Sequence, residues 1–318
     1  MAQVALYLYS SLGMESMTSM ISLGSQCWVS KLLRESYPGL FVSEQNVPTG
    51  VFDLIGTAPS MVAHVLTDHF QTLSNPGMYR PVGRRSGHFQ NEFYEDLLRE
   101  QALMYLDYYN LEIPDEAWSF LNSPPALFRH NTEHGLPSMC ETLARRGARM
   151  DSLLRNDNFK VLVWGMAIPY NHYVWAKRKQ LPIEAIIQEE LVTLFEAFTN
   201  DLHLEHFCLV GLLVIANVPE QAMLHDQEYP VTFLVRDTFA TMKRVAVTSS
   251  FDGATWKGHQ WADERMGICR FLNSCEDLMY QASRASISAQ APTPSSVPFT
   301  SLALRSNLLA LGDEVHEV

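Results

Sequence analysis

The sequence predicts an α/β protein: a mostly parallel sheet flanked by helices, with a large helical and irregular insertion after the first strand–helix unit. Phe207–Ala216, FCLVGLLVIA, is apolar throughout, which is typical of a strand covered on both faces. The amphipathic segment Ile183–Phe198 separates this run from a second apolar run, Phe159–Trp164. A strand, a helix and another strand in this order form a βαβ unit, in which the two strands are parallel.

The other elements follow from the same patterns. Met20–Leu23 predicts the first strand, and a helix begins directly after it, near Cys27. Val231–Val235 predicts a fourth buried strand. Ligands bind at the carboxyl ends of parallel strands, so we expect the loops after Leu23, Trp164 and Val235 to lie near one another. Further helices are predicted over Ser60–Phe70, Glu92–Tyr109, Glu141–Leu154 and Trp261–Ala285.

The chain is long and apolar enough to form one complete domain over residues 1–285, since 47% of its 318 residues are hydrophobic. Within this domain, residues from about 37 to 125 are rich in aromatic and turn residues. We interpret them as an insertion that covers or completes a site. Residues 286–318 contain three prolines among serines, and this composition predicts a disordered or loosely docked tail.

Charge and cysteine content exclude several classes of function. A net charge of −12 argues against binding to a nucleic-acid backbone, and the group Arg145, Arg146 and Arg149 is interpreted as solvated surface. Five cysteines without a CxxC pair predict reduced thiols, as in the cytoplasm. No signal peptide or apolar run of about 18 residues is present, so we expect neither membrane insertion nor secretion. The sequence does not indicate an oligomeric state.

Cys27 is the leading candidate for a functional residue. Gly24 permits a tight turn after the first strand, and Ser25 can cap the helix that Cys27 begins. The partial positive charge of a helix N-terminus favours a thiolate, and Lys31 adds a cation one turn later. The backbone N–H groups around Ser25 and Gln26 are candidates for an oxyanion hole. The alternative is that Cys27 is an inert, buried thiol.

A nucleophilic cysteine needs a base and a group that orients the base. His130, in a loop after a Pro-Pro break, is the first candidate base. Asp53 is the candidate orienting acid, because an acid in the apolar segment GVFDLIG is either buried with a partner or close to a site; the alternative is a turn or helix cap. His172, which follows the strand ending at Trp164, and Trp256 and His259 in the segment TWKGHQW are candidate substrate-site residues.

Metal and cofactor sites are not predicted. The spacing of His130 with His134, and of His203 with His206, is typical of metal ligands. However, the HExxH motif is absent, and both Gly135 and Pro137 disfavour a helix near His130 and His134. The sequence contains no GxxxxGK[ST], no GxGxxG after a strand and no GxSxG. We therefore expect a protein without a metal ion or cofactor.

Five short motifs resemble, in order, those of a bacterial-type family of unknown function described as papain-like cysteine peptidases. They are the SLGxxC motif at Ser22–Cys27, a PFDW-like motif at Val51–Leu54, FxH at Phe128–His130, an RR helix before a strand over Arg145–Trp164, and WxG…W at Trp256–Trp261. Together they span roughly residues 18 to 280. The chain departs from the family in two of these motifs: Val51 and Leu54 replace proline and tryptophan, and Asn131 replaces the usual acid after FxH.

The resemblance implies a cysteine-dependent hydrolase or acyl-transfer enzyme with Cys27 as nucleophile, His130 as base and Asp53 as orienting acid. Its substrate would be a peptide, an ester or a glycan-linked compound. A papain-like α+β fold is the alternative to the α/β fold that the strand and helix pattern predicts. The alternative function is a non-catalytic α/β binding or interaction module in which the SLGSQC loop binds an anion, because helix N-termini bind anions without special residues.

Overall fold

A computed structural model describes residues 18–24, 27–36, 50–81, 89–97, 135–222, 224–233, 238–252, 255–257 and 261–289. Its centre is a five-stranded sheet with the order β1-β4-β5-β7-β6. The first four strands in this order are parallel, and β6 is antiparallel to β7. The mostly parallel sheet confirms the predicted α/β class. The strands are β1 (Thr18–Ser22), β4 (Phe159–Pro169), β5 (Phe207–Ala216), β6 (Gln227–Phe233) and β7 (Phe239–Ala246).

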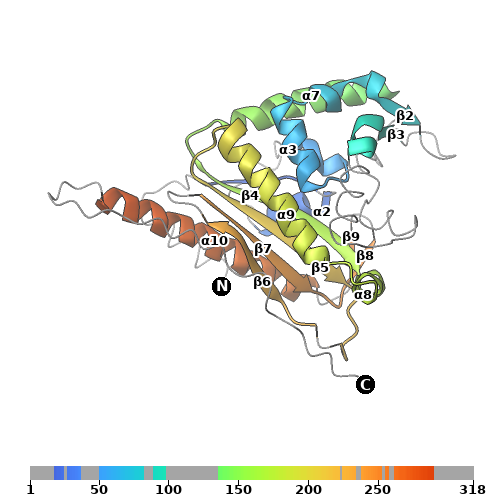
Figure 1. The fold of residues 1–318 in the computed structure, drawn as a ribbon, viewed down its shortest axis with the longest axis vertical. Helices are drawn as coiled ribbons and strands as arrows, with labels where there is room; N and C mark the ends of the chain where they lie inside the picture. Colours follow the sequence, from blue (N-terminus) through green and yellow to red (C-terminus); the bar gives the residue numbers. More distant parts are fainter. Residues whose placement is uncertain are drawn as a thin grey trace.

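Helices cover both faces of the sheet (Figure 1). The main helices are α2 (Cys27–Ser36), α3 (Pro59–Thr67), α7 (Gly135–Leu154), α8 (Tyr170–Arg178), α9 (Ile183–Glu196) and α10 (Trp261–Ala289). Shorter elements are the 3₁₀ turns η1 (Val51–Leu54) and η2 (Pro76–Met78), α4 (Gln71–Ser74), a helix over residues 92–97, and the π-helical turn η3 (Ala197–Asp201). Two small hairpins pair β2 (Tyr79–Pro81) with β3 (Phe89–Asn91) and β8 (Ser250–Asp252) with β9 (Thr255–Lys257).

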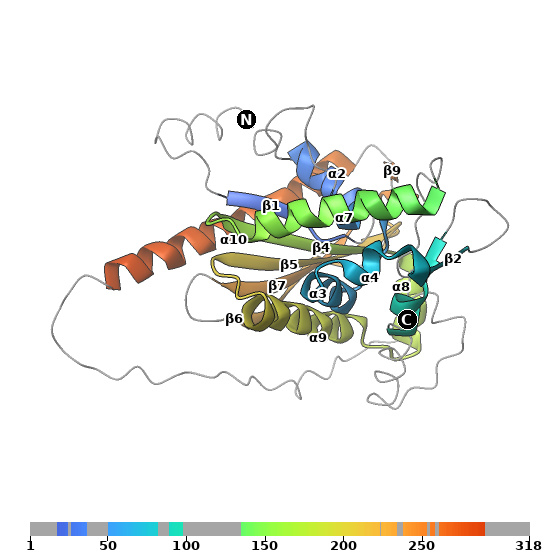
Figure 2. The ribbon, with the colours of Figure 1, turned by 90° about the horizontal axis from the view of Figure 1, so that it is seen from above.

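Strand alternation divides the core into two layers. On β5, Leu209 and Leu213 face a cluster formed with α3, α7 and α9, whereas Val210 and Leu212 face a cluster formed with α2 and α10. Figure 2 shows the sheet between α10 on one side and α3 with α9 on the other. Because both faces of β5 are covered, every residue of this strand is buried, which explains its uninterrupted apolar sequence.

The structure corrects the predicted positions of the loops at the sheet edge. β4 does not end at Trp164 but continues to Pro169, because β5 supplies a parallel partner as far as Ala216. Residues 231–233 of the segment predicted as a buried strand belong to β6, an edge strand in which Val231 is half-buried, and residues 234–235 lie outside the described residues. Only residues 234–238 separate β6 from β7, and such a short connection joins antiparallel neighbours. Because β6 runs antiparallel to the other strands, its C-terminal end lies at the other end of the sheet from the C-terminal end of β1.

Two further boundaries differ from prediction. The helix predicted from Glu141 begins at Gly135, so the argument that Gly135 and Pro137 exclude a helix was wrong. Proline is tolerated in a first turn, where backbone N–H groups have no intrahelical acceptor. The last helix continues to Ala289, past the predicted domain end at residue 285. The strand β7 was not predicted, because Thr241, Lys243 and Arg244 interrupt its apolar pattern.

Other predictions fall outside the described residues. Residues 37–49, 82–88 and 98–125 of the proposed insertion lie outside them, as do residues 290–318 of the proposed tail. The domain boundaries and the insertion stay predictions. Among the helices that the structure describes, none has the length and apolar character needed to cross a bilayer.

Candidate active site

Hydrogen bonds attach the end of β1 to the segment after η1. The Thr57 hydroxyl donates to the Leu23 carbonyl at 3.1 Å, and the buried Trp164 indole donates to the Thr57 carbonyl at 3.2 Å. This contact requires a glycine at position 24. The φ of Gly24 is +89°, and a Cβ at this position would lie 2.5 Å from Thr57 Oγ1. Gly24, just after β1, thus lies against the VFDL segment, since the same Cβ would lie 3.2 Å from Phe52 Cβ.

Gly24 provides a direct test of this packing. Gly24→Ala is expected to lower the free energy of unfolding by about 2–3 kcal/mol, since it adds left-handed backbone strain to a steric clash. Gly267→Ala on α10 is the control, because a Cβ there meets nothing within 4 Å among the described residues. The control is expected to stabilise by about 0.5–1 kcal/mol through helix propensity. Urea unfolding measures both, and an unchanged stability for Gly24→Ala would contradict the described turn.

Asp53 is the buried acid of this region. It lies on η1 and is 2% exposed. Its Oδ2 accepts a hydrogen bond from the Gly50 N–H at 2.7 Å and pairs with Arg34 Nη2 at 3.2 Å. Its Oδ1 is buried without a hydrogen-bond partner among the described residues. Burial raises the pKa of Asp53, and this outweighs the opposing effects of the Gly50 N–H, the Ser30 hydroxyl and Arg34.

Arg34 connects this acid to the helix that begins with Cys27. Ser30 and Arg34 lie at i+3 and i+7 from Cys27 on α2. Arg34 Nη2 donates to the Ser30 hydroxyl at 3.0 Å as well as to Asp53. The predicted acid therefore contacts α2 through an ion pair that the sequence analysis did not identify. The helical spacing of Arg34 from Cys27 is the signal that points to it.

Arg146, on α7, is a second cation whose charge interacts with that of Asp53. α7 packs on η1, and the Asp53 charge acts on Arg146. Burial lowers the pKa of Arg146, and its Nη1 is buried without a hydrogen-bond partner among the described residues. Arg145 and Arg149 are exposed on the same helix. The interpretation of all three arginines as solvated surface therefore holds only in part for Arg146, which is half-buried, because every third or fourth residue of a helix faces its neighbour.

The other face of α2 carries an aromatic cluster. Trp28, which follows Cys27, is 1% exposed and meets Trp256 edge to face at 5.9 Å between ring centroids. Trp256 stacks on Trp261 at 4.2 Å with an interplanar angle of 8°. A Cβ on Gly165 would lie 2.7 Å from the Trp28 ring, so a glycine on β4 is needed for this fit. The segment after β8 is thus packed beside the start of α2.

The structure describes only some of the other residues predicted for the site. Cys27 is the first residue of α2. Ser25, Gln26, His130 and His259 lie outside the described residues. His172 lies on α8 and is exposed. Since Ser22 pairs with Val163 and β4 continues to Pro169, α8 begins about 20 Å of extended strand beyond the end of β1. The structure does not bring His172 to Asp53.

The environments of the other cysteines distinguish them from a reactive thiol. Cys140, Cys208 and Cys275 are buried, and Cys269 is half-buried. Burial raises the pKa of Cys140 to about 11 and raises that of Cys208, which also exchanges a hydrogen bond with Cys275. Thiols with raised pKa values are poor nucleophiles at neutral pH. All four of these cysteines are free thiols.

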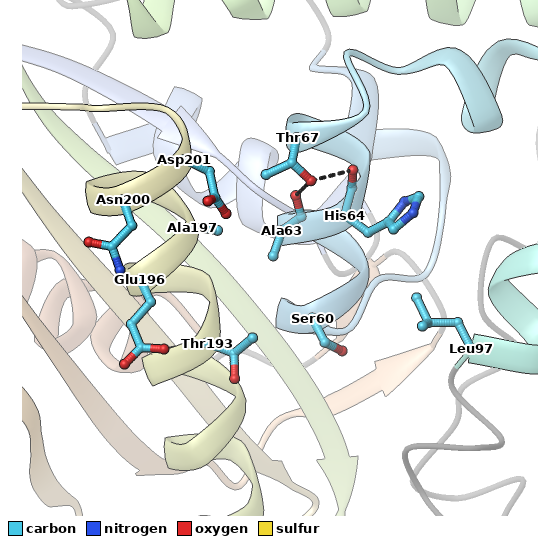
Figure 3. Close-up of a pocket in the computed structure, with 10 residues that line it drawn as sticks. All are labelled: Ser60, Ala63, His64, Thr67, Leu97, Thr193, Glu196, Ala197, Asn200 and Asp201. Carbon is cyan, nitrogen blue, oxygen red and sulfur yellow. Dashed lines mark hydrogen bonds between the residues drawn. The ribbon is translucent and has the colours of Figure 1, made fainter.

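A pocket of about 620 Å³ opens between α3 and the end of α9 (Figure 3). Ser60, His64 and Thr67 line it from α3, and Glu196 and Asp201 line it from α9 and η3. Ser60 donates its hydroxyl to Glu190 at 3.4 Å, and burial raises the pKa of Glu190 to about 7. The pocket offers polar groups, but it contains none of the site residues that the sequence predicted.

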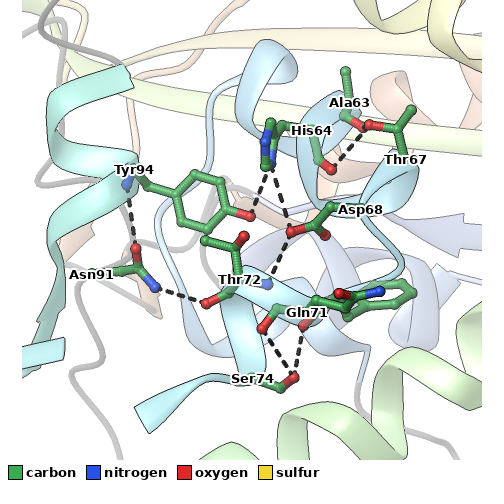
Figure 4. Close-up of polar contacts among 10 residues, drawn as sticks. Ala63, His64, Thr67, Asp68, Gln71, Thr72, Ser74, Asn91 and Tyr94 are labelled. Atoms are coloured by element: carbon green, nitrogen blue, oxygen red, sulfur yellow. Dashed lines mark hydrogen bonds and ion pairs between the residues drawn. The ribbon is translucent and has the colours of Figure 1, made fainter. Parts of the chain in front are cut away.

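A polar network beside this pocket holds His64 in place (Figure 4). His64 Nδ1 lies 3.3 Å from the Tyr94 hydroxyl and 3.8 Å from Asp68 Oδ2. Tyr94 is buried, which raises its pKa well above the usual value, and its N–H donates to Asn91 Oδ1. These contacts attach the helix over residues 92–97 to α3, so His64 has a structural role here.

No metal site or known relative adds to this geometry. Among the described residues, no group of three or more His, Cys, Asp or Glu side chains could hold a metal ion. Comparison of the chain with protein-family models, curated proteins and solved structures finds no match. The chemistry of the site must therefore be argued from its own residues.

Proposed function

We propose that this protein is a cysteine-dependent hydrolase or acyl-transfer enzyme in which Cys27 is the nucleophile, His130 the general base and Asp53 the orienting acid. The Cys27 thiolate attacks the acyl carbon of a peptide, ester or glycan-linked substrate, and His130 gives a proton to the leaving group. Water, activated by the same histidine, then hydrolyses the thioester and releases the acid. Backbone N–H groups around Ser25–Trp28 stabilise the oxyanion.

The observation that carries the proposal is the state of Asp53. A carboxylate that is 2% exposed is costly unless its oxygens are satisfied, yet its Oδ1 has no hydrogen-bond partner among the described residues. Oδ2 is held by the Gly50 N–H and Arg34, which fix the orientation of the group. An oriented, buried carboxylate with one open oxygen is suited to accept an imidazole N–H.

The arrangement of the motifs supports the same proposal. Gly24 lies against Phe52 of the VFDL segment, the Asp53 charge acts on Arg146 of the RR helix, and Trp256 of the WxG…W element contacts Trp28. Motifs that are far apart in sequence thus gather around α2. The proposal takes its chemistry from papain-like peptidases, whereas the sheet that carries the residues is mostly parallel. Free thiols at Cys140 and Cys208 agree with a reducing compartment such as the cytoplasm.

Hydrolysis of an activated ester tests the proposal. Cys27→Ser is expected to abolish hydrolysis of p-nitrophenyl acetate, with a loss of about 1000-fold or more in kcat/KM. Cys269→Ser is the matched control, because it removes another thiol that is not fully buried, and it is expected to leave the rate unchanged. Equal rates for the wild type and Cys27→Ser would contradict the proposal.

A further inference from the structure

We propose that Arg146 binds an oxyanion, a carboxylate or phosphate group of the substrate, beside Asp53. The inference rests on the proposed function for its catalytic meaning, but the binding itself does not depend on Cys27. It defines the substrate as an acidic compound. It also assigns a specificity-determining role to a residue that the sequence analysis placed on the solvated surface.

The charges around Asp53 do not balance. Asp53 carries one negative charge, which Arg34 neutralises through the ion pair at 3.2 Å. Arg146 is a second cation on which the Asp53 charge acts, on a helix that packs on η1, and the Arg145 and Arg149 charges also act on it from α7. The cluster therefore has an excess of positive charge at a place where burial already disfavours the charged form of Arg146. A ligand with one negative charge would compensate this excess.

An unmet hydrogen-bond donor marks the position of that ligand. Arg146 Nη1 is buried and has no acceptor among the described residues. Guanidinium groups are satisfied by planar, two-oxygen acceptors such as carboxylate and phosphate. A buried, unsatisfied donor is rare in folded proteins, and such exceptions are found where a ligand or water completes the site.

The backbone holds Arg146 in this position. The next residue, Gly147, packs so closely on the turn between α3 and α4 that a Cβ would lie 2.6 Å from the Phe70 ring. Leu143 and Met150, on the same face of α7, are buried in the core. This packing fixes the rotation of α7 about its axis, and with it the direction in which the half-buried Arg146 side chain leaves the helix. A side chain held in place before the ligand arrives loses less entropy on binding.

Isothermal titration of the full chain with inorganic phosphate and, separately, with succinate tests the proposal. Wild type and Cys27→Ser are both expected to bind one of the two anions. Arg146→Gln is expected to weaken that binding about tenfold or more. Arg145→Gln, which removes the same charge from an exposed position on the same helix, is expected to change it less than twofold. Whichever probe binds identifies the acidic group as phosphate or carboxylate.

Four outcomes would overturn the inference. The first is the absence of binding by either probe to the wild type, which means that only water bridges Arg146 and Asp53. The second is equal weakening in Arg145→Gln, which means non-specific attraction. The third is full binding by Arg146→Gln. If Arg146→Gln does not fold, as judged by circular dichroism, Arg146→Lys replaces it and must bind more weakly than wild type. Loss of binding in Cys27→Ser would overturn it too, whereas anion binding without a reactive Cys27 rejects only the hydrolase.

Discussion

Asp53→Asn is expected to reduce ester hydrolysis about 1000-fold while the protein stays folded. The asparagine has the same shape and can still accept a hydrogen bond from the Gly50 N–H. It cannot hold an imidazolium by charge, and that charge is what the proposed mechanism requires of Asp53. The fold is expected to tolerate the change, because burial penalises the charged form of Asp53 and raises its pKa.

The pH dependence of stability separates the effect of Asp53→Asn on catalysis from its effect on the fold. Because the pKa of Asp53 is raised in the folded state, the unfolded chain loses this proton first, and ionisation weakens the fold as pH rises above 3.8, its ordinary pKa. The difference in free energy of unfolding between wild type and Asp53→Asn is therefore expected to fall as pH rises from that value. Asp151→Asn, at a surface ion pair with Arg155 on α7, is the control and is expected to retain activity. Full activity of a folded Asp53→Asn protein would remove Asp53 from the mechanism.

Glu184→Gln is expected to lower the free energy of unfolding by about 3 kcal/mol. Glu184 Oε1 accepts hydrogen bonds from the Tyr173 hydroxyl at 2.6 Å and from Arg244 Nη1 at 2.9 Å, and Oε2 pairs with Lys177 at 2.9 Å. The network joins α8 and α9 to β7. Removing the acid leaves the Arg244 side chain, which is 12% exposed, without its counter-charge. Breaking one side of a buried ion pair is costly for this reason.

Glu184 also contributes to the decrease in the free energy of unfolding at acidic pH. Burial alone would raise the pKa of Glu184, but the Tyr173 hydrogen bond and the Lys177 charge outweigh it and lower the pKa. This stabilisation is complete above 4.5, the ordinary pKa of glutamate, and is lost as pH falls through the lowered value. Urea unfolding at several pH values should therefore show a shallower acid dependence for Glu184→Gln. Glu196→Gln, exposed on the same helix, should change stability by less than about 0.5 kcal/mol, and an equal effect of both variants would contradict the role of the network.

The parts of the fold with strong periodicity could be predicted from the sequence. β5 coincides with the predicted range Phe207–Ala216, and α9 lies within the predicted helix, because a fully covered strand and an amphipathic helix leave clear patterns. The direction of β6 could not be read from Val231–Val235, since an apolar run does not indicate whether its neighbour is parallel. β7 was missed because Arg244 belongs to a buried ion network, and its charge interrupts the apolar pattern.

The candidate site could be predicted only in part. The burial of Asp53 followed from its apolar surroundings, because an acid in such a segment is either paired or functional. Its partner Arg34 and the neighbouring Arg146 depend on how α2 and α7 pack on η1, which no local pattern encodes. The contact of Trp28 with Trp256 joins residues more than 200 positions apart in the chain. His172 seemed close to the site only because β4 was predicted to end at Trp164.

Competitive alkylation of the thiols tests the central claim that Cys27 is an activated nucleophile. The folded protein is treated with a limiting amount of iodoacetamide at pH 6, and mass spectrometry follows the modification of each cysteine. Cys27 is expected to react about tenfold faster than the half-buried Cys269, and faster still than Cys140 and Cys208, whose pKa values burial raises. If Cys27 reacts no faster than Cys269, the nucleophile assignment and the hydrolase proposal are both wrong.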